Sequence, residues 1–142
     1  MSLFNVFNVS GSALNAETIR LNTTASNLAN AESTNGDVTK VYRARHPVFQ
    51  SMLDAQSGAS LDDEDASTGV RVLGIVESNA APLKSYQPAH PLADKDGYVY
   101  TSNVNSIEEM TNMISANRSF ATNVEAINTA RDLLLKVISM GH

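Results

Sequence analysis

The two ends of this chain carry apolar residues at the spacing of coiled-coil helices, and the middle does not. Successive positions alternate steps of three and four residues, which keeps one face of a helix toward a partner. Near the start, this stripe comprises Phe4, Phe7, Gly11, Leu14, Thr18, Leu21, Ala25 and Leu28. Near the end, it comprises Met110, Met113, Asn117, Phe120, Val124, Ile127, Arg131, Leu134 and Ile138. Two helices that each require a partner predict a protein whose function is packing.

The middle of the chain is interrupted by turns and prolines, which exclude long helices there. We predict strands over residues 40–45, 69–77 and 98–100. The sequence therefore predicts an α+β fold, with terminal helices over 1–33 and 106–142 and a small, loop-rich β module over 34–105. An acidic stretch gives this module a flexible loop over 55–68, and a divalent-cation site in that loop is a weaker alternative. The interrupting residues are Asn35-Gly36, Ser57-Gly58, Pro47, Pro82, Pro88 and Pro91.

The first helix is poor in charge on every face. Between Met1 and Asn35 the only charged residues are Glu17, Arg20 and Glu32, and the rest is rich in Asn, Ser, Thr and Ala. Asn, Ser and Thr side chains compete for backbone hydrogen bonds, so we expect a helix that is weak in isolation. Two interpretations remain open at this point: an ordinary two-helix hairpin with few surface charges, or a segment buried on several faces in an assembly.

Composition excludes several classes of function. The formal net charge of -5 and the pI near 5.0 do not provide the basic surface that nucleic acid requires. The chain has no Cys, hence no disulfide framework and no thiolate zinc site. No apolar run approaches a membrane span, and the first residues lack the basic leader of a cleavable signal peptide. We therefore expect neither nucleic-acid binding nor membrane insertion.

One cluster has the residue types of a metal or catalytic site. His90, Asp94 and Asp96 are close in sequence and precede Gly97, so a metal-binding hydrolase is an alternative interpretation. The spacing does not continue as a calcium loop, and Asp-Gly ahead of a Tyr-Val-Tyr strand is the more typical turn signal. We found no nucleophile elbow, phosphate loop or paired zinc histidines, and we predict a protein that is not an enzyme and has no cofactor.

Several of these residues resemble motifs of flagellar basal-body rod proteins. The end of the first helix resembles the amino-terminal signature of that family, shared by rod and hook relatives. A second segment is similar, more narrowly, to the proximal rod proteins. The first match is Leu21-Asn22-Thr23-Thr24-Ala25-Ser26-Asn27-Leu28-Ala29-Asn30-Ala31. The second runs from Tyr86 through His90, Pro91, Leu92, Asp94, Asp96, Gly97 and Tyr98 to Val99, with Asn103-Val104-Asn105, Glu109-Met110 and Ala116 to Asn123 after it.

The resemblance implies a structural subunit of the proximal rod. The terminal helices would pair as an antiparallel coiled coil, stack around a hollow axis and transmit torque from motor to hook, with the β module outside. Implied partners are proximal and distal rod proteins, the adaptor to the MS ring, further copies of this chain and the flagellar type III export apparatus. The implied location is the periplasmic basal body, reached without a cleaved signal peptide. Another axial flagellar or type III secretion component is the nearest alternative.

The resemblance and the stripes together assign candidate assembly residues to both helices. In the first helix these are Phe4, Phe7, Leu14, Leu21, Asn27, Leu28 and Asn30, and in the second Met110, Met113, Asn117, Phe120, Val124, Ile127, Leu134 and Ile138.

We expect the isolated subunit to order its first helix poorly, because weak helices need neighbours to offset their ordering entropy. Hydrogen exchange on purified monomer should show little protection over residues 3–30. Strong protection throughout that range would contradict this prediction.

Overall fold

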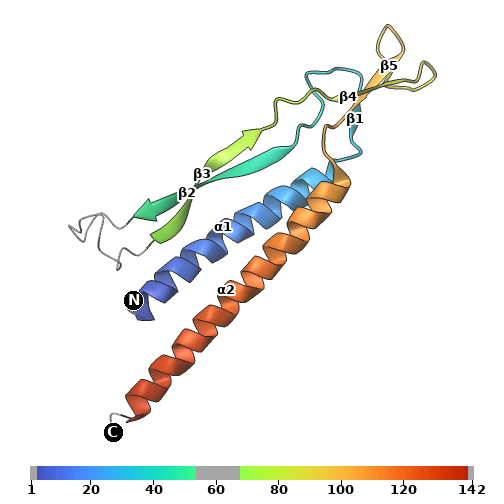
Figure 1. The fold of residues 1–142 in the computed structure, drawn as a ribbon. Coiled ribbons are helices and arrows are strands. Elements are labelled where there is room, and N and C mark those ends of the chain that lie inside the picture. The colour runs from blue at the N-terminus through green and yellow to red at the C-terminus, as the bar shows by residue number, and fades with distance from the viewer. Residues whose placement is uncertain (1–2, 54–67, 141–142) are drawn as a thin grey trace. The chain divides into compact units, whose positions relative to one another are not determined.

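The computed structural model describes residues 3–53 and 68–140. Within these residues, the chain forms a helix at each end and five strands between the two helices (Figure 1). The predicted α+β fold, with a helix at each end and small sheets between, is confirmed. The predicted acidic loop and the Ser57-Gly58 turn lie outside the described residues, apart from Thr68 at the edge of that loop. The elements are α1 (Leu3–Ala29), β1 (Thr34–Asn35), β2 (Arg45–Leu53), β3 (Thr68–Glu77), β4 (Leu83–Tyr86), β5 (Tyr98–Thr101) and α2 (Ser106–Met140).

The chain forms two compact units, each assembled from segments far apart in sequence. One contains the described parts of residues 1–19, 48–74 and 115–142, and the other contains 20–47 and 75–114. Both helices and the β2–β3 pair contribute to each unit. Neither unit therefore corresponds to a single continuous stretch of sequence. No helix among the described residues combines the length and apolar character needed to cross a bilayer.

The start of α2 is fixed by a capping asparagine. The Asn105 side-chain oxygen accepts hydrogen bonds from the backbone N–H of Ile107 at 3.1 Å and of Glu108 at 3.4 Å. This satisfies two of the backbone donors that a helix start leaves unpaired. Glu108 occupies the third helical position, as in a capping box, and its acidic side chain also suits the positive end of the helix dipole.

The end of α1 is closed by short-range turns. The backbone N–H of Asn30 donates to the carbonyls of Ser26 and Asn27, and the Asn30 side chain donates to the Ser26 carbonyl at 2.8 Å. Ala31 and Ser33 continue with bonds to carbonyls three residues earlier. These bonds use carbonyls that the helix end would leave exposed, and the chain then passes directly into β1.

Three short strands form an antiparallel sheet in the order β1-β5-β4. Val99, at the centre of β5, is only 2% exposed and pairs with Ser85. Gly97 precedes β5 with a φ of +77°, a conformation that side chains disfavour. The predicted strand over 98–100 is confirmed, and β4, whose residues are all exposed, was not predicted.

The other two strands, β2 and β3, pair only with each other, and their arrows point in opposite directions in Figure 1. The predicted strand over 69–77 is confirmed, with Val70 and Val72 half-buried, although Leu73 and Ile75 are exposed. The predicted strand over 40–45 is wrong: β2 begins at Arg45 and extends to Leu53. A two-stranded pair has free edges, which explains why β2 accommodates Pro47.

The backbone at Gly36, in the turn after β1, lies so close to the backbone of Leu92 that it leaves no room for a side chain. A Cβ added at Gly36 would clash with the carbonyl oxygen of Leu92, and backbone atoms cannot move aside as a flexible side chain would. We predict that Gly36→Ala destabilises the subunit by about 1–3 kcal/mol in urea unfolding, the usual cost of overpacking. Gly74→Ala is the matched control, because no atom lies within 4 Å of the added Cβ. Equal stability of the two variants would refute the close approach.

Candidate assembly site

One face of α1 is exposed, uncharged and built from small or amide side chains. Its positions alternate steps of three and four residues along the helix, so they form a continuous row. We call it the α1 outer row. It consists of Asn8, Gly11, Asn15, Thr18, Asn22, Ala25 and Ala29, all of which are exposed. The larger residues Phe7, Leu14, Leu21 and Leu28 are half-buried, and the side chain of Phe4 lies outside the described set.

On α2, the covered face keeps part of the predicted stripe and replaces the rest by residues one position earlier. Met113, Phe120, Val124, Ile127 and Leu134 are half-buried, as a packed stripe requires. The most buried positions are instead Ala116, at 0% exposure, with Glu109 and Ala130.

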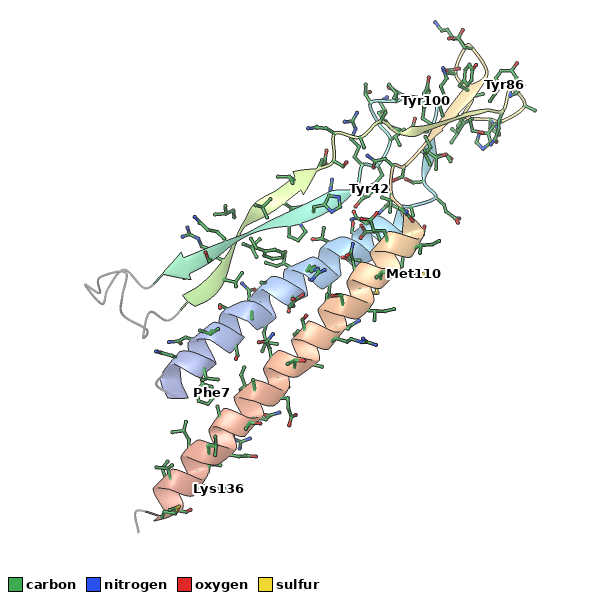
Figure 2. All side chains as sticks on the ribbon, viewed as in Figure 1. Phe7, Tyr42, Tyr86, Tyr100, Met110 and Lys136 are labelled. Atoms are coloured by element: carbon green, nitrogen blue, oxygen red, sulfur yellow. The ribbon has the colours of Figure 1, made fainter. Side chains whose placement is uncertain are left out.

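Four residues of the predicted stripe on α2 are exposed in the subunit. They are Met110, which Figure 2 labels, Asn117, Arg131 and Ile138. Small alanine side chains therefore occupy the covered face, and part of the predicted stripe is left exposed by the described residues.

Asn27 holds the chain segment that leads into β2. Its side-chain oxygen accepts from the Arg45 N–H and from the Tyr42 hydroxyl, both at 2.9 Å, and its amide nitrogen donates to the Arg45 carbonyl at 2.8 Å. Asn27 is 1% exposed, so these bonds form out of water. Tyr42, labelled in Figure 2, also lies 3.2 Å from the Ser26 hydroxyl. Asn27 thus bonds within the subunit, and Asn30 caps α1.

A second side-chain amide, that of Asn103, holds Ala44, the residue before Arg45. Its oxygen accepts from the Ala44 N–H at 2.8 Å, and its nitrogen donates to the Ala80 carbonyl at 2.8 Å. Ala44 also belongs to a small apolar core with Ala31 and Val104, against which Tyr42 packs. Residues 44 and 45 are therefore bonded from both α1 and the segment before α2, which replaces the strand pairing predicted there.

The segment similar to proximal rod proteins folds as a turn organised by Asp94. One oxygen of Asp94 accepts from the backbone N–H groups of Asp96 at 2.9 Å and Tyr98 at 2.8 Å, and the other accepts from the Tyr100 hydroxyl at 3.1 Å. The bond from the Tyr98 backbone is the main cause that lowers the pKa of Asp94. Desolvation, followed by the bond to Asp94, raises the pKa of Tyr100.

Aromatic contacts hold the two strands that flank this turn. The rings of Tyr86 and Tyr98 meet edge to face at 5.2 Å between centroids, and the Lys84 ammonium lies 3.7 Å from the Tyr98 centroid. Tyr86 and Tyr100 are labelled in Figure 2 on adjacent strands. Pro91 and Leu92 follow in the turn, where the Leu92 N–H donates to Nδ1 of His90 at 3.1 Å.

This geometry gives His90, Asp94 and Asp96 a structural explanation. Asp94 is occupied by hydrogen bonds from its own turn, and His90 Nδ1 accepts from a neighbouring backbone group. Within the part of the chain that the structure describes, no three His, Cys, Asp or Glu side chains are grouped to hold a metal. These hydrogen bonds support the interpretation of His90, Asp94 and Asp96 as parts of a turn.

Sequence reasoning missed three of the asparagine roles described above. The Asn105 cap had a readable signal, because Asn and Glu three residues apart ahead of a helix form a capping pattern. Asn27 and Asn103 had no such signal, since their backbone partners are 18 and 59 residues away in sequence.

Comparison with known proteins gives a consistent result over almost the whole chain. A family model described as "Flagella basal body rod protein" matches residues 7–36, and one described as "Flagellar basal body rod FlgEFG protein C-terminal" matches residues 95–140. The chain is 44% identical to the flagellar basal-body rod protein FlgC of Salmonella typhimurium over 99% of both chains. Identity is 45% to FlgC of Escherichia coli O6:H1 and 40% to FlgC of Buchnera aphidicola from Schizaphis graminum, with the same coverage.

The Asn27 clamp predicts a specific loss of stability. Asn27→Ala removes three hydrogen bonds at once, two to the N–H and carbonyl of Arg45 and one to the Tyr42 hydroxyl, and each such bond contributes about 0.5–1.5 kcal/mol. We expect the free energy of unfolding to fall by about 2–4 kcal/mol. The matched control is Asn22→Ala, on the exposed α1 outer row, for which we expect a change below about 0.5 kcal/mol. Similar urea midpoints for the two variants would contradict a stabilising role of the Asn27 hydrogen bonds.

Proposed function

Because this chain belongs to the FlgC family of flagellar basal-body rod proteins, we propose that α1 and α2 pair as an antiparallel coiled coil and polymerise into the hollow proximal rod. The chain is a structural rod subunit of the bacterial flagellar basal body, as the resemblance predicted. The family is structural, which agrees with the prediction that the chain is not an enzyme. In our proposal, the polymer transmits torque from motor to hook.

The α1 outer row is the observation that carries this proposal. A helix exposed to water as its final state ordinarily carries Lys and Glu on that face. Here the exposed face has only amide, hydroxyl and small apolar side chains, and α1 contains no charged residues besides Glu17 and Arg20. Small side chains permit close approach of another helix, and amides provide hydrogen bonds across the contact. The row therefore suits burial against neighbouring subunits.

The covered residues of the two helices support their pairing within a subunit. On α1, Phe7, Leu14, Leu21 and Leu28 repeat every seven residues and are half-buried, while Met113, Phe120, Ile127 and Leu134 do the same on α2. A seven-residue repeat is the signature of helices that follow one another along a seam. The buried alanines of α2 bring the two backbones close along that seam.

Assembly with other flagellar rod components follows from membership of the family. We propose that the specific neighbours are proximal and distal rod proteins, the adaptor to the MS ring and further copies of this chain. We also propose a periplasmic location reached through the flagellar type III export apparatus. The turn around Asp94 and the exposed β4 strand belong, in this proposal, to a module outside the helical tube.

The proposal predicts that charges introduced into the helix stripes block assembly. Leu28→Asp and Phe120→Asp each place an unpaired carboxylate at a half-buried apolar position, which is costly. We expect incorporation into basal bodies to fall about tenfold or more, since each ~1.4 kcal/mol changes an association constant tenfold. Immunoblots of purified basal bodies and swimming assays measure the effect.

Val38→Asp is the control, because it makes the same kind of change at an exposed site in the turn after β1. Motility at the normal level with either helix variant would exclude that residue from the assembly.

A further inference from the structure

Near its end, α2 presents a face that nothing in the described chain covers. Leu135 is 53% exposed and Ile138 is 60% exposed, and Arg131 is exposed one turn before Leu135. At 3.6 residues per turn, these three residues share one side of the helix. We call this side the α2 outer face. It combines two large aliphatic side chains with one cation, and such a patch is a typical protein contact surface.

A groove lies on the roughly opposite side of α2. It has a volume of about 690 Å³ and is lined mainly by small side chains, with Val6 of α1 at one border. Ala126 and Ala130 form part of the lining, and Thr122, Thr129 and Leu133 border it. Helices pack by inserting a ridge of side chains into a groove between rows four residues apart. The small residues leave room in this shallow groove for aliphatic side chains of a neighbour.

The groove and the outer face carry opposite charges that form no ion pair with the residues that the structure describes. Glu125 lines the groove, and Arg131 lies on the outer face. Their separation of six residues is about one and two-thirds turns, which places them about 120° apart around the helix and about 9 Å apart along it, out of mutual reach. Across the described ranges, neither side chain forms an ion pair.

We infer that the groove of one subunit receives the α2 outer face of a second copy of this chain, with Arg131 of one copy paired to Glu125 of the next. In a parallel arrangement that aligns these charges, Leu135 of one copy lies beside Thr129 of the other, and Ile138 lies near Leu133. The aliphatic side chains fill the alanine-lined groove. The exposed ion pair sets register and specificity and adds little affinity.

The two patches differ, so the contact is heterologous and each added subunit leaves one groove and one outer face free. Such contacts generate open arrays or rings, whereas a contact between identical patches closes into a dimer. This inference rests on the proposed rod function and specifies one lateral contact within it.

Disulfide trapping tests the contact directly, because the chain contains no Cys. We would combine Thr129→Cys with Leu135→Cys in one subunit and oxidise purified basal bodies. The two positions are about 9 Å apart along one helix, beyond the Cα–Cα reach of about 7 Å, so an intramolecular disulfide is geometrically excluded. We expect a ladder of dimers, trimers and larger homo-oligomers on non-reducing gels. Each single variant should give no homodimer, since the contact joins different patches.

Several outcomes would overturn the inference. Dimers from a single variant would indicate a contact between identical patches, and disulfides formed only with other rod proteins would make the occupant a different chain. Incorporation without any ladder would refute this contact while leaving the rod function intact. If the unmodified chain itself is absent from basal bodies, the proposed function fails.

A charge exchange provides an independent test that does not depend on disulfide geometry. Glu125→Arg and Arg131→Glu should each reduce incorporation, because each places like charges opposite one another in the contact. The double variant should restore incorporation, and Lys95→Glu, a charge reversal at an exposed position in the turn before β5, should have no effect. Failure of the double variant to recover, or normal incorporation of both single variants, would refute the pairing.

Discussion

The bidentate bond between the Asn27 amide and the backbone of Arg45 joins the last turns of α1 to the start of β2. Backbone N–H and carbonyl groups at the start of a strand need partners where the sheet does not supply them. Asn27 supplies both at once, at 2.9 and 2.8 Å, and Asn103 does the same for the N–H of Ala44. Neutral amides perform this role without the desolvation cost of burying a charge. The start of β2 is thereby tied to α1 and to the segment before α2.

The parts of the fold that could be predicted are those with a local signal in the sequence. The terminal helices were predictable, because a seven-residue repeat of apolar side chains can be recognised within the segment itself. The strands at 69–77 and 98–100 also were, since β-branched and aromatic residues follow turn signals there. The strand expected at 40–45 was not, because its backbone partners are side-chain amides from distant segments. β4 was missed for a different reason, since all four of its residues are exposed and give no burial pattern.

The stripe on α2 shows a second limit of periodicity. Side-chain size favoured Met110 and Ile138 as covered residues, but the subunit covers Ala116 and Ala130 and leaves the larger residues exposed. Positions one residue apart differ by about 100° around a helix, so one run of apolar residues can serve two adjacent faces. Sequence spacing identifies the apolar residues of the helix, but it does not tell which of them pack inside the subunit and which are exposed for an external contact. The division becomes visible only when the exposed side chains are known.

This division between packed and exposed apolar residues explains why we expect the free subunit to have low stability. Leu135 and Ile138 remain in water as long as the chain is alone, and the α1 outer row gains no stabilising contacts. A chain that satisfied these faces internally would be more stable alone and would have nothing left to contribute to a polymer. The nearly uncharged surface of α1 and the exposed aliphatic face of α2 therefore have one physical cause. In the proposed function, that cause is a polymer in which neighbouring subunits cover both helices.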